Sequence, residues 1–296
     1  MKKLIFKGAA VALVTPMNKD GSVNYETLSE LIEYQIKNGT DAIVSCGTTG
    51  ESATLSQKEH SEIIKFTVDK VNGRVPVIAG TGSNNTQHAL ELSQNAEKLG
   101  CDGLLIVTPY YNKTSQKGLV EHYTYIADRV NLPIITYTVP SRTGVSIKPE
   151  THLELSKHPN IVATKEASGN ISDVAKIKSL CGDNLHIYSG NDDQIVPFLS
   201  LGSMGVISVF SNVCPKECHD ITQLFFSGNI EKSREIFLKY LDLMNMLFCD
   251  VNPMPVKEAL NLIGFDCGKC RLPLTSLCEE DHKKLVETLN RYKIKK

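Results

Sequence analysis

The sequence has no marked excess of charge and no apolar run long enough to span a bilayer. Its 296 residues carry a formal net charge of -1, and without a basic bias we expect no nucleic-acid partner. A membrane helix needs roughly 20 consecutive apolar residues. No segment approaches this length, so we expect no membrane partner either. Because 41% of the residues are hydrophobic, the chain can bury one large core or two modest ones.

The nine cysteines lack the regular spacing of a disulfide framework. In a chain of this length we interpret them as reduced thiols of a cytosolic protein. Cys267 and Cys270, with Cys278 nearby, are at metal-like spacing, but the sequence offers neither a fourth ligand nor a second close pair. We therefore expect ordinary loop cysteines and no metal.

The N-terminus lacks a clear export signal. Residues 1–3, Met-Lys-Lys, precede apolar residues as in a signal peptide, but Lys7 interrupts the apolar stretch. The segment also ends in Thr15-Pro16, where a small-residue cleavage site would be needed. We interpret residues 9–17 as a first buried strand and expect a cytoplasmic location.

Short apolar runs rich in β-branched residues recur along the chain, and each is too short for a typical helix. Several are apolar almost throughout, as strands buried on both faces must be. The eight predicted strands cover residues 9–17, 41–48, 76–81, 103–109, 133–140, 161–168, 185–190 and 205–210.

Amphipathic segments with helix start and stop signals separate these runs. Ser56 opens a capping box, and the helix that follows it is predicted to stop at Gly73. Thr86 precedes a second apolar stripe, which stops at Gly100, and a third stripe covers residues 28–36. These segments supply the helices that join parallel strands.

Eight strands alternating with helices predict a parallel sheet, and eight strands close a (β/α)₈ TIM barrel. A doubly wound sheet would want a Gly-rich dinucleotide turn after the first strand, and residues 15–21 contain none. From about residue 215 onward the chain carries only helical periodicity. We expect a barrel with the active site over residues 1–228 and a C-terminal helical region, 229–296, packed on it without a flexible linker.

A lysine and a glutamate lie near the C-terminal end of the sixth predicted strand, the end from which catalytic side chains of such barrels project. By alternation, Lys165 shares a face with Ile161 and Ala163, and Glu166 faces the other way. Burial favours the neutral form of a lysine amine, and a neutral amine attacks a ketone to form an imine. A structural buried ion pair is the alternative interpretation.

Polar side chains end the neighbouring strands too. Tyr137 ends the fifth strand, where a phenol can shuttle protons or serve as a core aromatic. Thr48 and Thr49 end the second strand, where hydroxyls can relay protons, hold a carboxylate or cap a turn. Arg142 follows the fifth strand, where a guanidinium can grip a substrate carboxylate or brace a loop. Their convergence on one rim favours carbonyl chemistry on an acidic substrate.

Motifs at these residues, over nearly the whole chain, resemble those of the dihydrodipicolinate synthase and N-acetylneuraminate lyase family. Arg142 and the double threonine favour the synthase branch, because the lyase branch typically has Gly-Ser-Thr-Gly-Glu and lacks that arginine. The matching segments are Gly47-Thr-Thr-Gly-Glu51, Thr108-Pro-Tyr-Tyr-Asn112, residues 137–144, Lys165-Glu166, Ser189-Gly190, Gly205-Val-Ile-Ser208 and Asn252-Pro-Met-Pro-Val-Lys257.

The resemblance implies a pyruvate-dependent synthase of the diaminopimelate and lysine pathway. Lys165 would form a Schiff base with pyruvate, and Tyr137 and Thr48 would relay protons together with Tyr111, which would enter the neighbouring subunit's site. The pyruvate enamine would attack the aldehyde of L-aspartate β-semialdehyde, and the substrate's own amine would then displace Lys165. No metal or organic cofactor is implied, because the lysine supplies the electron sink.

For binding, the resemblance implies that Arg142 holds the carboxylate of the semialdehyde. Thr49, Gly190 and Ile207 would line the pyruvate pocket. The resemblance also implies a homotetramer built as a dimer of tight dimers, and the role of Tyr111 requires at least the dimer.

The family also has an inhibitory lysine site at the subunit interface, and two positions depart from it. Gln57 stands where lysine-sensitive members have histidine, and His88 stands where they have glutamate. The missing carboxylate would pair with the effector's ammonium group, so we expect weak or absent inhibition by lysine. The other positions of this possible effector site are compatible with it: Ser52, Ala53, His60, Asn84 and Tyr110.

Two other functions fit part of the pattern. A sibling aldolase or lyase acting on a 2-keto-3-deoxy sugar acid or N-acetylneuraminate would share Lys165 and Tyr137 but would have no use for Arg142. A non-catalytic ligand-binding barrel would keep the fold, and the intact set of lysine, tyrosine and threonine argues against it.

Overall fold

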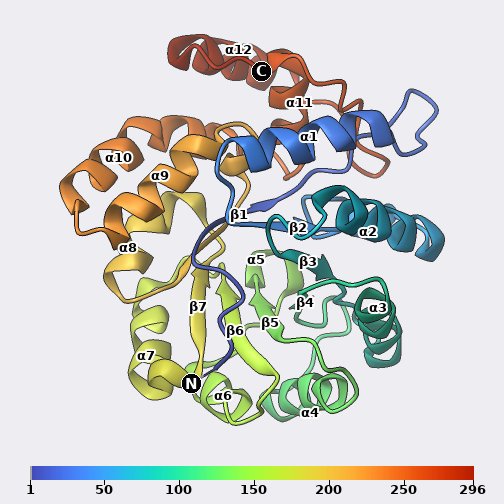
Figure 1. Cartoon of the computed structure of the whole chain (residues 1–296), viewed down its shortest axis with the longest axis vertical. Coiled ribbons are helices and arrows are strands. Elements are labelled where there is room, and N and C mark those ends of the chain that lie inside the picture. The colour runs from blue at the N-terminus through green and yellow to red at the C-terminus, as the bar shows by residue number, and fades with distance from the viewer. Residues whose placement is uncertain (1) are drawn as a thin grey trace.

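A computed structural model describes residues 2–296, in which eight parallel strands close into a barrel in chain order, β1 pairing with β8 (Figure 1). The TIM barrel expected from the sequence is therefore confirmed, and each strand overlaps one predicted run. Met1, which the expected barrel region includes, lies outside the described residues. The strands are β1 (Gly8–Ala12), β2 (Ala42–Ser45), β3 (Val77–Gly80), β4 (Gly103–Val107), β5 (Ile134–Thr138), β6 (Ile161–Glu166), β7 (His186–Ser189) and β8 (Gly205–Ser208).

Helices surround the barrel. Ser56 forms the predicted capping box, since its side chain accepts from the Glu59 backbone and the Glu59 carboxylate accepts from the Ser56 backbone. Asn85 caps α3, because its side-chain oxygen accepts from the Gln87 and His88 backbone N–H groups. Thr86 is the first residue of the helix, and its hydroxyl lies 2.9 Å from His122 Nδ1. The elements are α1 (Tyr25–Lys37), η1 (Ser52–Thr54), α2 (Gln57–Val71), α3 (Thr86–Lys98), α4 (Gln116–Ala127), α5 (Pro140–Thr143), α6 (Pro149–Leu155), α7 (Ile171–Cys181), η2 (Gly182–Asn184), η3 (Asp192–Gln194), α8 (Ile195–Ser200), η4 (Phe210–Asn212) and α9 (Pro215–Phe226).

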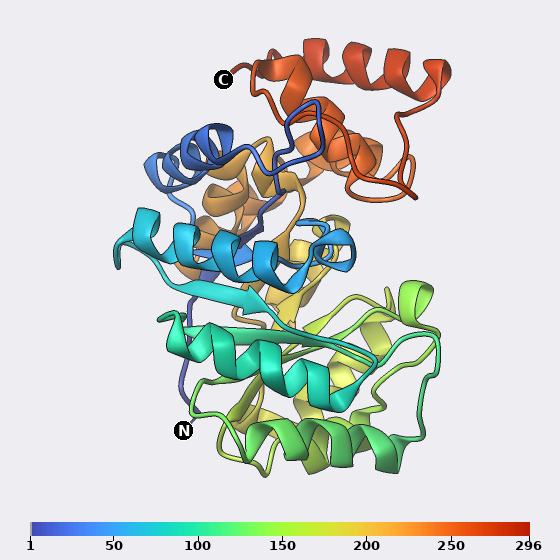
Figure 2. The same cartoon turned by 90° about the vertical axis from the view of Figure 1, so that its right-hand side faces the viewer.

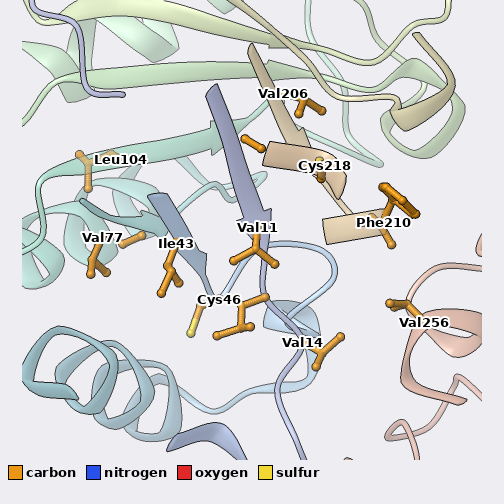
Figure 3. Packing of buried hydrophobic residues seen from close by; sticks show 14 of the residues in the cluster. Val11, Val14, Ile43, Cys46, Val77, Leu104, Val206, Phe210, Cys218 and Val256 are labelled. Carbon is orange, nitrogen blue, oxygen red and sulfur yellow. The ribbon is translucent and has the colours of Figure 1, made fainter. Parts of the chain in front are cut away.

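Strand side chains alternate between two cores. Val11, Ile43 and Val77, from adjacent strands, point to the same side and belong to the core between the strands and the helices (Figure 3). Ala10 and Val44, one position away, belong to a separate cluster inside the barrel. Every strand is therefore buried on both faces, which explains the nearly continuous apolar runs.

The alternation is broken within β6. Ile161 pairs with Ile134 of β5, but Ala163 pairs with Ile135, so Val162 is an extra residue in the ladder. Ile161 accordingly lies in the outer core and Ala163 in the inner cluster. The prediction that Ile161 shares a face with Lys165 is wrong for this reason.

The C-terminal region consists of α10 (Ile230–Met246), α11 (Met254–Ile263) and α12 (Glu279–Tyr292). α10 packs on α8 and α9, α11 contacts η4, and α12 packs on α10 and α11. Both views show α11 and α12 stacked at one end of the molecule, with α12 outermost (Figures 1 and 2). The boundary between residues 228 and 229 falls in the turn between α9 and α10, and the division of the chain there remains a proposal.

Two features of the described residues bear on function. Between residues 2 and 296 no helix is long and apolar enough to cross a membrane. The same residues contain no group of three or more histidine, cysteine, aspartate or glutamate side chains arranged to hold a metal ion. Cys267 is buried and Cys270 half-buried, and both carry free thiols.

Candidate active site

Lys165 lies one residue before the C-terminal end of β6 and is only 6% exposed. Burial lowers the pKa of its amine to about 8, with Asp192 opposing and Arg142 reinforcing this shift. The Nζ atom lies 4.4 Å from the centroid of the Tyr137 ring. A substantial fraction of the amine is therefore neutral near physiological pH, as a nucleophile requires.

Tyr137 is the register partner of Lys165 on β5, so the two side chains leave neighbouring strands at the same level. It lies in the inner cluster with Ile135 and Val139, as alternation predicts. Burial raises the pKa of its phenol to about 12, while Arg142 and the Thr48 side chain act in the opposite direction. The phenol therefore keeps its proton at neutral pH and can donate it to a neighbouring oxygen.

The loop after β2 carries Thr48 and Thr49 and ends at Glu51, whose backbone is in the left-handed region with φ 56°. Glu51 is buried, and Lys257 of α11 donates to its Oε1 over 2.8 Å, while the Arg271 backbone N–H donates to its Oε2 over 2.8 Å. Thr49 is buried as well, and its Oγ1 accepts from Asn252 Nδ2 over 3.0 Å. Both the end of this loop and the Thr49 hydroxyl are thus held by the C-terminal region.

Arg142 lies on the single turn α5, which begins with Pro140 and ends at Gly144 with φ 71°. Its Nη2 donates to the backbone oxygen of Asn252 over 3.1 Å. This is the one hydrogen bond that the guanidinium makes within residues 2–296, so its other N–H groups remain available to an anion.

These side chains line one cavity of about 190 Å³. At about 30 Å³ per water molecule, this volume suits a small compound of a few heavy atoms. Gly190 forms part of the wall, and a Cβ there would lie 3.0 Å from Lys165 Cε. Ile207 does not line the cavity; it is fully buried within the inner cluster. The predicted residues that do line it are Thr48, Thr49, Tyr137, Arg142, Lys165 and Gly190.

Asp192 was not expected at the site. It is buried in η3, and its Oδ2 accepts from the Val209 and Phe210 backbone N–H groups over 3.0 and 2.8 Å. Its charge opposes the burial-driven fall in the pKa of Lys165. In the sequence, Asp192 is recognisable only as an aspartate two residues after Gly190. No local sequence pattern indicates that it lies near Lys165 on β6.

Tyr111 lies outside the cavity. It is 91% exposed and left-handed, with φ 69°. Its position after β4 matches the expected rim location, and the single chain leaves its ring free to contact another molecule.

A second cavity, of about 450 Å³, lies against the first and shares Thr48, Val139, Arg142 and Asn252 with it. Gln57 and Asn84 are not among the residues that line it. Five residues of the possible effector site do line it: Ser52, Ala53, His60, His88 and Tyr110.

Comparison with known proteins agrees with this geometry. The model of the dihydrodipicolinate synthetase family matches residues 5–292. The chain belongs to this family. It is 56% identical over 290 residues to the 4-hydroxy-tetrahydrodipicolinate synthase of Caldicellulosiruptor bescii, covering 98% of each chain.

Solved structures of the dihydrodipicolinate synthetase family have the same fold. The dihydrodipicolinate synthase of Acinetobacter baumannii, described as chloride inhibited and complexed with pyruvate, has a TM-score of 0.96 at 42% identity, with 98% of this chain and all of that chain covered. A monomeric dihydrodipicolinate synthase variant has the same TM-score and identity, with 98% of each chain covered. The expected family and the expectation of an enzyme are confirmed.

Proposed function

We propose that this family member is a 4-hydroxy-tetrahydrodipicolinate synthase, which condenses pyruvate with L-aspartate β-semialdehyde. The observation that carries the proposal is the buried Lys165 amine, its pKa lowered to about 8, in a small cavity beside Tyr137. A structural ion pair would need a direct anionic partner. Within residues 2–296 the fully buried lysine that has one is Lys257, paired with Glu51, and Lys165 forms no salt bridge.

The first half of the reaction would capture pyruvate. The neutral Lys165 amine attacks the keto carbon, and the carbinolamine loses water to give an iminium ion. Tyr137 is suited to protonate the departing hydroxyl, since its proton is retained at neutral pH. Thr48, whose side chain interacts with the Tyr137 phenol, would pass the proton on. Thr49 and the backbone around Gly190 would hold the pyruvate carboxylate.

The second half would join the carbon chains. Loss of a methyl proton converts the iminium ion to an enamine, whose carbon attacks the aldehyde of the second substrate. The free N–H groups of Arg142 are placed to bind that substrate's carboxylate. The substrate amine then attacks the imine carbon, closes the ring and returns the Lys165 amine.

Substrate specificity tests this assignment. Purified protein with pyruvate is expected to consume L-aspartate β-semialdehyde and form the heterocycle, and to leave 2-keto-3-deoxy sugar acids and N-acetylneuraminate uncleaved. The reverse preference would assign the chain to the sibling lyases instead. The presence of Arg142 beside the cavity favours the synthase.

The proposed assembly is a homotetramer, a dimer of dimers. Tyr111 supports this assembly, because its backbone is in the left-handed region and its side chain is 91% exposed. In the assembly it would reach the proton relay of Tyr137 and Thr48 in the neighbouring subunit. The second cavity would be the effector site of the family. His88, which lines it, and Gln57, which lies outside its lining, would weaken its response to lysine. We also propose a cytoplasmic location, which suits nine free thiols.

A further inference from the structure

Asn252 connects the C-terminal region to both sides of the cavity. It precedes α11 and is only 5% exposed. Its side-chain Nδ2 donates to Thr49 Oγ1 over 3.0 Å, and its backbone oxygen accepts from Arg142 Nη2 over 3.1 Å. The residue proposed to hold pyruvate and the residue proposed to hold the aldehyde substrate therefore share one partner.

The hydrogen bond to Thr49 sets the direction in which that hydroxyl can act. A threonine hydroxyl has one proton to donate and two lone pairs. Because the Asn252 amide occupies a lone pair, the Thr49 proton stays free to donate to an anion in the cavity. An acceptor in the place of the amide nitrogen would take that proton instead.

A buried ion pair connects α11 with the loop after β2. Lys257 and Glu51 are 2.8 Å apart, and their side chains are 2% and 1% exposed. Lys257 also donates to the Lys269 backbone oxygen over 3.0 Å. Removal of one partner from such a pair leaves an unpaired buried charge, so this ion pair ties α11 to the loop after β2.

We propose that Asn252 is a positioning residue of the active site: its amide directs the Thr49 hydroxyl toward the pyruvate carboxylate, and its carbonyl orients Arg142. This inference rests on the proposed function. It makes the C-terminal region part of the catalytic unit.

Two substitutions at Asn252 distinguish a role in directing the Thr49 hydroxyl from a role in packing. Asn252→Ala removes the donor to Thr49 but leaves the carbonyl that accepts from Arg142. We expect the pyruvate KM to rise about tenfold, the cost of one buried hydrogen bond, with the semialdehyde KM changed less than about twofold. Asn252→Asp keeps the shape but accepts the Thr49 proton and adds a negative charge. We expect it to raise the pyruvate KM about 100-fold, more than alanine does.

Which variant has the larger rise in pyruvate KM, Asn252→Asp or Asn252→Ala, distinguishes a positioning residue from one that only supports the structure. A residue needed only for packing would tolerate the isosteric aspartate better than alanine. Asn261→Ala is the matched control. Asn261 also lies in the C-terminal region, but among residues 2–296 its side chain bonds only to the backbone of Gly268 and Cys267. We expect it to leave the pyruvate KM unchanged.

The experiment is steady-state kinetics with pyruvate and L-aspartate β-semialdehyde on the wild-type protein and the three variants, with melting temperatures measured in parallel. A wild-type pyruvate KM in Asn252→Asp, or a milder effect than in Asn252→Ala, would overturn the inference. Pyruvate and borohydride are also added to each protein. If the wild type forms no adduct, the proposed function itself fails; an adduct with unaltered KM values in both variants rejects only the role of Asn252.

Discussion

Replacing Lys165 with methionine is expected to abolish pyruvate capture and, at neutral pH, to stabilise the fold. The reason is that Lys165 is 6% exposed and its pKa falls from the ordinary 10.5 to about 8 in the folded chain. At about 1.4 kcal/mol per tenfold change in proton affinity, the charged lysine costs the fold about 3 kcal/mol. Methionine has a similar length and carries no charge.

The sign of the pH dependence follows from the direction of the shift. Between pH 8 and 10.5 the unfolded chain binds more protons at this lysine than the folded chain does, so wild-type stability rises with pH in that window. The cost is fully present below pH 8. We therefore expect Lys165→Met to be more stable by about 3 kcal/mol at pH 7 and by less than about 1 kcal/mol at pH 10.

Urea unfolding followed by circular dichroism measures this difference at pH 7, 8, 9 and 10, at equal protein concentrations because any oligomer adds to stability. Lys283→Met, at an exposed lysine on α12, is the matched control and should change stability by less than about 0.5 kcal/mol. A Lys165→Met variant no more stable than the wild type at pH 7, or a gain that is equal at pH 7 and 10, would refute the account of a desolvated amine.

Three further predictions concern ligand binding. Arg142→Ala should raise the semialdehyde KM at least about tenfold, since the charge-assisted contact with the substrate carboxylate is lost. A rise in the pyruvate KM alone would contradict this. In Gly190→Ala the new Cβ would lie 2.7 Å from Ala167 Cβ and 3.0 Å from Lys165 Cε. The end of β6 must then shift, so pyruvate adduct formation, followed by mass spectrometry, should slow at least about tenfold; a wild-type rate would exclude this crowding. L-lysine below millimolar concentration should inhibit weakly or not at all, and Gln57→His with His88→Glu should increase sensitivity; steep inhibition of the wild type would reject this interpretation.

The barrel could be predicted because each strand is buried on both faces, which gives short apolar runs that differ clearly from the amphipathic helices. The error at Ile161 has a definite cause. Alternation assumes an unbroken ladder, and the extra residue Val162 shifts the register. Register in a barrel depends on the neighbouring strands, and no local pattern in β6 carries that information.

The residues at the strand ends could be predicted for the same reason, since parallel strands bring Lys165 and Tyr137 to one rim. Asn252 and Asp192 could not be placed in this way. Asn252 is 203 residues from Thr49 in the chain, and only packing of the C-terminal region brings them together. Ile207 is predicted at the cavity wall, and alternation does place it inside the barrel with Tyr137. It is fully buried, however, and does not reach the cavity.

The central claim is that Lys165 is the amine that captures pyruvate. Incubation with pyruvate and borohydride, followed by intact mass measurement and peptide mapping, tests it most directly. We predict one reduced pyruvate adduct per chain, on the peptide that contains Lys165, and none in Lys165→Met. Folded protein without an adduct, or an adduct on another lysine, would contradict the account.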